Sequence, residues 1–105
     1  MTTPKLVYIR QLSGGDAEFE AKLIAVLKKE LPKEIELFNE NIRQNNLLKA
    51  AGNVHKIKHK ISILSMDESF FVAEEFENEL RNDRLELQKD FIEILKKMTT
   101  FLSQL

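Results

Sequence analysis

The chain has 105 residues, of which 43% are hydrophobic and 31% charged, and this composition predicts a single globular domain over residues 1–105. Its 16 basic and 17 acidic residues nearly cancel, which excludes a general attraction to nucleic acid, and the absence of cysteine excludes disulfides and thiol chemistry. There is no apolar leader and no apolar run of the ~20 residues that span a bilayer, so we expect a cytoplasmic protein without membrane contact.

Hydrophobic spacing predicts helices along the whole chain. A short apolar segment over about residues 6–12 is expected to form an N-terminal helix, although its length also fits a strand. Asp16 is a favourable N-cap for a long helix over about residues 16–44. Pro32 is expected to kink that helix, because proline removes a backbone donor and clashes with the preceding turn.

The second half of the chain predicts three more helices. Ser65 with Glu68, and Asp83 with Glu86, have the spacing of capping boxes that would begin the last two. The helix before them, over about residues 47–64, has an apolar stripe at regular spacing: Ala50, Val54, Ile57, Ile61 and Leu64. We therefore expect an all-α fold, an antiparallel four-helix bundle with a short N-terminal helix packed over one end.

Both histidines of the chain, His55 and His59, lie close together on that helix. At ~100° per residue, His55 points roughly 140° and His59 roughly 180° away from the apolar stripe, so both imidazoles are expected to face solvent. Neutral imidazole is a nucleophile near neutral pH and can accept a phosphoryl group from an acyl phosphate. Lys58, one turn from His55, can neutralise phosphoryl oxygens. The same residues also fit a solvated helix face without a chemical role.

Leu48 and Gly52 share the exposed side of the helix with both histidines. An apolar residue and a missing side chain beside an exposed histidine favour a surface on which a partner docks flat. The alternative is a single exposed leucine, which is common, and a glycine that weakens the helix by about 1 kcal/mol without a function. The predicted partner-binding residues are Leu48, Gly52, Lys56, His59 and Ser62.

Two stretches, residues 12–19 (LSGGDAEF) and residues 54–58 (VHKIK), have a separation and sequence that resemble a known family. The family is the histidine-containing phosphotransfer (HPt) domain of multistep phosphorelays. The resemblance covers nearly the whole chain. It implies that His55 is the phosphoacceptor and that Lys58 assists it.

The resemblance also implies the partners: receiver domains of response regulators or hybrid histidine kinases, which supply the phospho-aspartate and the Mg²⁺. The chain itself would then hold no metal or other cofactor, and would act as a monomeric phosphocarrier rather than as an enzyme. Two positions depart from the family pattern. His59 stands where the family usually has a small residue, and Ser65, which could cap the next helix, stands where it often has glycine.

Other functions remain to be weighed against the carrier. The chain could be a non-phosphorylated interaction module that binds a receiver or another signalling protein through the same helix face. The two histidines could present a pair of metal ligands, but no carboxylate lies on the adjoining turns and lysines surround them, so no metal site is expected. The lysines could form a nucleic-acid face, but that helix has no aromatic residue for stacking, so no nucleic acid is expected.

Overall fold

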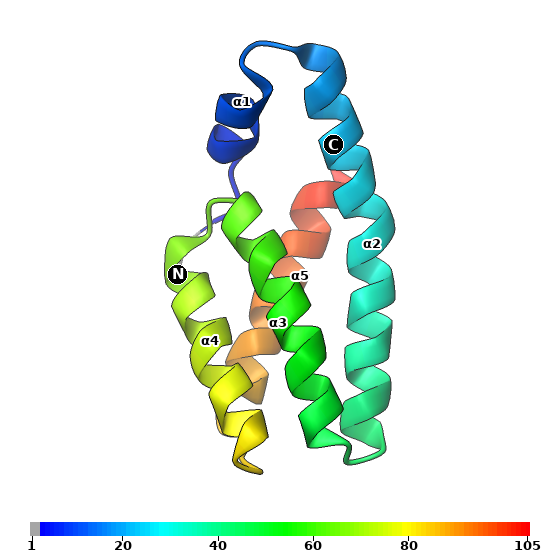
Figure 1. Ribbon diagram of the computed structural model, residues 1–105, viewed down its shortest axis with the longest axis vertical. Helices are drawn as coiled ribbons and strands as arrows, with labels where there is room; N and C mark the ends of the chain where they lie inside the picture. The colour runs from blue at the N-terminus through cyan, green and yellow to red at the C-terminus, as the bar shows by residue number, and fades with distance from the viewer. Residues whose placement is uncertain (1–2) are drawn as a thin grey trace.

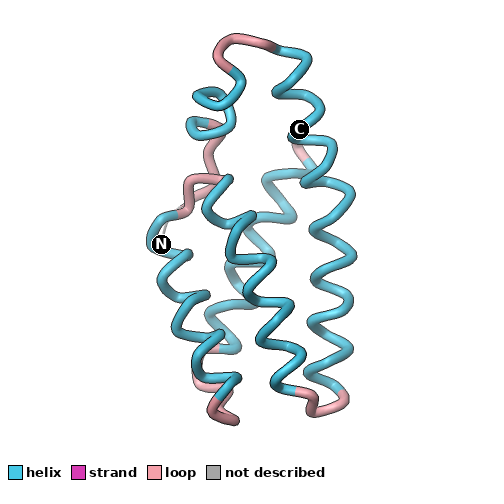
Figure 2. Tube along the Cα trace, in the orientation of Figure 1, coloured by secondary structure: helices cyan, strands magenta, loops and turns pink. Residues whose placement is uncertain are grey.

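The computed structural model describes residues 3–105, and every regular element in this part of the chain is an α-helix (Figures 1 and 2). The helices are α1 (Val7–Ser13), α2 (Ala17–Arg43), α3 (Leu47–Ile63), α4 (Asp67–Arg81) and α5 (Gln88–Ser103). The predicted all-α class is confirmed, and the N-terminal apolar segment is a helix rather than a strand. Residues 1 and 2, which the predicted domain over 1–105 includes, lie outside the described residues.

The four longer helices run along the 44 Å axis of the molecule (Figure 1). α3 packs against α2 and α4, and α5 packs against the same two neighbours. α1 lies at one end, beside the turn between α3 and α4. There the Lys5 N–H donates to the Leu64 carbonyl at 2.8 Å, and the Tyr8 N–H is 3.4 Å from the Ser65 hydroxyl.

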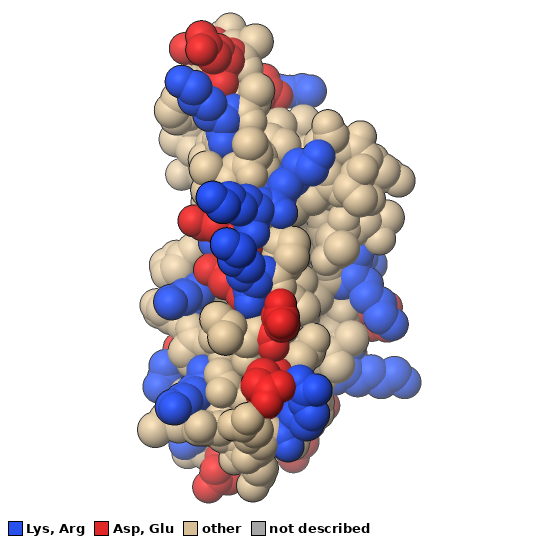
Figure 3. Space-filling view, turned by 90° about the vertical axis from the view of Figure 1, so that its right-hand side faces the viewer, with Lys and Arg blue, Asp and Glu red and all other residues tan. Residues whose placement is uncertain are grey.

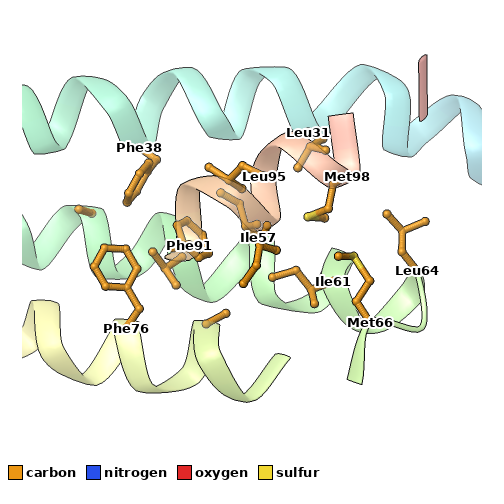
Figure 4. Packing of buried hydrophobic residues seen from close by; sticks show 14 of the residues in the cluster. Leu31, Phe38, Ile57, Ile61, Leu64, Met66, Phe76, Phe91, Leu95 and Met98 are labelled. Atoms are coloured by element: carbon orange, nitrogen blue, oxygen red, sulfur yellow. The ribbon is translucent and has the colours of Figure 1, made fainter. Parts of the chain in front are cut away.

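Apolar side chains from all five helices build one continuous core (Figure 4). Phe38 of α2 packs edge-on against Phe76 of α4 and Phe91 of α5, with ring centroids 6.0 and 5.2 Å away, a favourable aromatic geometry. The predicted α3 stripe is fully buried at 0% exposure: Ala50, Val54, Ile57, Ile61 and Leu64. Because this stripe is fixed in the core, the opposite face of α3 is held toward solvent.

The long second helix begins where the sequence predicts. Asp16 Oδ1 accepts hydrogen bonds from the N–H groups of Glu18 and Phe19, at 3.0 and 3.1 Å. The helix then continues through Pro32 as one element. That proline lies on the exposed side, where water can satisfy the carbonyl that loses its donor.

Both predicted capping boxes are wrong. Ser65 and Asp83 have φ angles of 60° and 57°, so they are left-handed turn residues that follow a helix, whereas an N-cap has a non-helical, typically extended backbone. Met66 is the N-cap of α4 and Leu87 that of α5. The Leu87 N–H donates to Glu79 Oε1 at 2.8 Å, so a buried carboxylate of α4 anchors the start of α5.

Candidate functional site

His55 and His59 are both exposed on the solvent face of α3, which confirms their predicted orientation. The His55 side chain is 51% exposed. The two imidazole rings stand edge to face, with centroids 5.0 Å apart and planes at 89°. Among residues 3–105, His59 has no hydrogen-bond or ion-pair partner.

A nearly buried carboxylate of α4, Glu77, connects His55 to two cations. Glu77 Oε1 is 3.1 Å from Lys58 Nζ and 3.2 Å from His55 Nδ1. Glu77 Oε2 accepts a hydrogen bond from an Arg81 guanidinium N–H at 3.0 Å. The Glu77 side chain is only 10% exposed, so these contacts replace most of its water. The ionised form of the carboxylate is therefore stabilised by these three neighbours rather than by water.

The protonation of Glu77 determines which nitrogen of His55 is free. Burial raises the pKa of the Glu77 carboxyl, but hydrogen bonds from Arg81, Lys58 and His55 outweigh burial and hold the pKa below its ordinary value of 4.5. Glu77 is therefore ionised at neutral pH and can only accept hydrogen bonds. The proton between the two residues must then belong to His55 Nδ1, which leaves the lone pair on Nε2.

Lys58 lies on the core-side flank of α3, and its ammonium is already engaged. The Lys58 side chain is 11% exposed, and Nζ lies against Glu77 and 5.5 Å from the centre of the Phe70 ring. That distance is within the range of a cation–π interaction. The structure therefore brings Lys58 and His55 to the same oxygen of Glu77.

The lysine-rich segment around the histidines carries less free positive charge than its sequence suggests. Lys60 Nζ lies 3.1 Å from Glu30 and 3.3 Å from Glu34 of α2, and its side chain is 11% exposed. Lys58 is paired with Glu77, whereas Lys56 is exposed. On the α2 side of the molecule, basic and acidic side chains are likewise interspersed (Figure 3).

The predicted partner-binding residues share the exposed side of α3. Leu48 is 66% exposed, which is high for a leucine. A Cβ on Gly52 would meet no heavy atom within 4 Å, so packing inside the chain does not require glycine at this position. The exposed predicted residues are Leu48, Gly52, Lys56, His59 and Ser62.

Sequence reasoning missed two residues beside this face. Phe71 of α4 is 64% exposed and lines a hollow with Phe70, Asp67 and Ser62, which extends the surface from α3 onto α4. Glu77 is not among the residues that the sequence predicts for the site. Its spacing held a signal, because it follows the buried Ala73 by one helical turn and so falls at the edge of the α4 core stripe.

The expectation of no metal site rested on the absence of a carboxylate on the turns adjoining the two histidines and on the lysines around them. Glu77 nevertheless reaches His55 from another helix, which the sequence of α3 alone does not reveal. Within residues 3–105, however, no three histidine, aspartate or glutamate side chains gather in a way that could hold a metal ion. His55 and Glu77 are joined by a hydrogen bond and form no larger ligand set.

Comparison with known proteins identifies the family. The Hpt domain profile matches residues 22–105, which includes residues 54–58 and Glu77 but not the first resembling stretch, residues 12–19. No curated protein and no solved structure matches the chain. Within the described residues, no helix has both the length and the hydrophobicity needed to cross a bilayer. The chain belongs to the Hpt domain family, whose members are phosphocarrier modules that exchange phosphoryl groups with receiver domains in phosphorelays.

Proposed function

We propose that this chain accepts a phosphoryl group on His55 from the phospho-aspartate of one receiver domain and passes it to another receiver. The observation that supports the proposal most strongly is the 3.2 Å contact between His55 Nδ1 and Glu77. Because an ionised Glu77 keeps the proton on Nδ1, the lone pair is left on Nε2 of a half-exposed ring. A nucleophile in this state needs no general base of its own.

The transfer step follows from this arrangement. The Nε2 lone pair forms a bond to phosphorus while the bond from phosphorus to the aspartate oxygen breaks, and that bonding pair leaves with the aspartate carboxylate. The imidazole becomes positively charged, and Glu77 stabilises that charge through the Nδ1 proton, which it does not remove. The return step to a second receiver reverses these bond changes. The chain is thus a carrier, and the Mg²⁺ is expected on the receiver.

Lys58 is proposed to assist in two ways. Its ammonium contributes to the low pKa of Glu77 and thereby to the tautomer of His55. An ammonium has three N–H donors, so Lys58 can direct one toward a phosphoryl oxygen while another remains on Glu77. The positive charge of Lys58, which shares Glu77 Oε1 with His55, favours the phosphorylated state electrostatically.

The receiver is proposed to dock on the exposed side of α3, over Leu48, Gly52, Lys56, His59 and Ser62. The absence of a side chain at Gly52 would let the partner backbone approach closely beside His55. We also propose that α2–α5 act as an antiparallel four-helix bundle with α1 over one end, a rigid support for this face. In this account the chain works as a monomer in the cytoplasm.

The test is transfer from a panel of phosphorylated receivers to the wild type, His55→Gln and His59→Gln. The proposal expects an acid-labile, alkali-stable label on the wild type and on His59→Gln, and none on His55→Gln. A non-phosphorylated interaction module would instead form a stoichiometric complex with a receiver, without transfer, and would still do so as His55→Ala. That result would replace the carrier with the module.

A further inference from the structure

The proposed function gives one exposed side chain beside the nucleophile a place in docking but no part in the chemistry. His59 follows His55 by one turn of α3, and the two rings stand edge to face with centroids 5.0 Å apart. Its ring nitrogens bond to nothing in residues 3–105. The His59 ring can therefore form a hydrogen bond to a phosphoryl group carried on His55.

Three of the cations on or near this face already have glutamate partners, so Lys58 can offer the phosphoryl group only part of its donors. Lys58 and Arg81 are bound to Glu77, and Lys60 is bound to glutamates of α2. Lys56 is exposed, but it adjoins His55 in sequence, and adjacent residues of a helix point in different directions. Residues four apart share a face, so His59 is the better-placed donor toward Nε2 of His55.

We propose that a ring N–H of His59 donates a hydrogen bond to the phosphoryl group carried on His55 Nε2. The inference rests on the proposed function and identifies a residue that binds the transferred group. Imidazole has an N–H in both its neutral and its protonated forms, so the contact does not require a particular charge on His59. A phosphoryl oxygen is a strong acceptor, and hydrogen bonds to charged acceptors are stronger than those between neutral groups.

The edge-to-face geometry supports this contact. With centroids 5.0 Å apart, the two rings are in direct contact, so a group bonded to the His55 ring adjoins the His59 ring. The nitrogens of imidazole lie on the ring edge, and rotation about the side-chain bonds of His59 can present an N–H to a phosphoryl oxygen without movement of the helix. The contact stabilises phosphorylated His55 relative to the free histidine. The phosphorylated chain should then hydrolyse more slowly than it would without His59.

Phosphoramidate, a small phosphodonor that needs no docking surface, separates this role from receiver binding. The wild type, His59→Gln, His59→Ala and the control Lys49→Gln, at an exposed lysine of α3 outside the proposed docking residues, are phosphorylated with it. The hydrolysis half-life of phospho-His55 is then measured. The half-life should fall about tenfold in His59→Ala, which corresponds to one hydrogen bond. It should be largely retained in His59→Gln, which keeps an N–H donor, and in Lys49→Gln.

Nuclear magnetic resonance of the imidazole nitrogens gives a readout that a merely structural role would not move. The His59 nitrogen shifts should change when His55 is phosphorylated. Equal half-lives in His59→Ala and the wild type, with unchanged His59 shifts, would overturn the role of His59 and leave the proposed function intact. No phosphate on wild-type His55, from phosphoramidate or from any receiver, would instead overturn the proposed function and the role of His59 together.

Discussion

Replacing Glu77 with glutamine tests the arrangement on which the account depends. The change keeps the shape of the side chain and removes its charge. Lys58 and Arg81 lose their counter-charge, and His55 loses the acceptor that fixes its tautomer, because an amide can either donate to Nδ1 or accept from it. Both the stability of the fold and the reactivity of His55 should therefore fall.

The loss of stability follows from the exposure of each partner. Lys58 is 11% exposed, so its ammonium cannot recover its hydration easily, whereas Arg81 is 45% exposed and His55 is 51% exposed. Removing one partner of a fully buried ion pair costs about 3–5 kcal/mol, and a hydrogen bond to a charged group contributes about 1.5–3 kcal/mol. With one nearly buried contact and two exposed ones, we expect a loss of about 2–3 kcal/mol in the free energy of unfolding.

Urea unfolding at neutral pH measures this loss, and phosphorylation by phosphoramidate measures the reactivity of His55. We expect Glu77→Gln to be phosphorylated about tenfold more slowly, the equivalent of one hydrogen bond. The matched control is Glu79→Gln on the same helix. Glu79 is also buried, but it accepts its hydrogen bond from the Leu87 N–H. The amide oxygen of glutamine can still accept that bond. This control should lose less than about 1 kcal/mol and should be phosphorylated at the wild-type rate.

The outcome that would refute the reasoning is a Glu77→Gln protein with wild-type stability and wild-type phosphorylation. The Glu77 network would then be a surface feature without consequence. Equal slowing in Glu77→Gln and Glu79→Gln would attribute the effect to a general loosening of α4 rather than to His55. Imidazole nitrogen shifts decide the tautomer directly, since wild-type His55 should carry its proton on Nδ1.

Four further predictions concern pH, helix stability and docking at Gly52, and the left-handed turn at Ser65. Because the pKa of Glu77 is lowered in the folded state, ionised Glu77 contributes its full stabilisation above pH 4.5, its ordinary pKa. That contribution is lost as the pH falls through the lowered pKa. The difference in the free energy of unfolding between the wild type and Glu77→Gln, measured by urea unfolding, should therefore narrow below pH 4.5, and a constant difference would contradict this. Gly52→Ala should raise stability by about 1 kcal/mol, because its Cβ enters open space. Gly52→Trp should block transfer from receivers while phosphoramidate still reacts, and unimpaired transfer would disprove docking at Gly52. Ser65→Gly should stabilise the chain by about 1 kcal/mol in thermal or urea unfolding, since Ser65 has a φ of 60°, and a loss would show that its hydroxyl matters more.

Local periodicity explains why much of this molecule could be predicted from its sequence. The apolar stripe of α3 depends on helical spacing alone, and its burial fixes the opposite face, so the exposure of His55 and His59 follows. The cap at Asp16 is equally local, because its carboxylate bonds N–H groups two and three residues on. Features that one helix determines by itself can thus be predicted from the sequence.

Features that two helices determine together cannot be predicted from local pattern. Glu77 meets His55 across 22 residues of sequence, and the pairing depends on how α3 and α4 are aligned. The spacing at Ser65 and Asp83 predicts caps where the structure has left-handed turns, because the residue spacing of a capping box says nothing of the sign of φ. Local pattern places side chains on a face, whereas helix packing decides which faces meet.

The central claim is that His55 accepts the phosphoryl group on Nε2, with its Nδ1 proton held by Glu77. Phosphorus–nitrogen coupling in the phosphorylated, nitrogen-labelled protein tests it most directly. The account predicts coupling to Nε2 of His55, and no phosphorylated histidine in His55→Gln. A phosphoryl group on Nδ1, on His59, or still present in His55→Gln would contradict it.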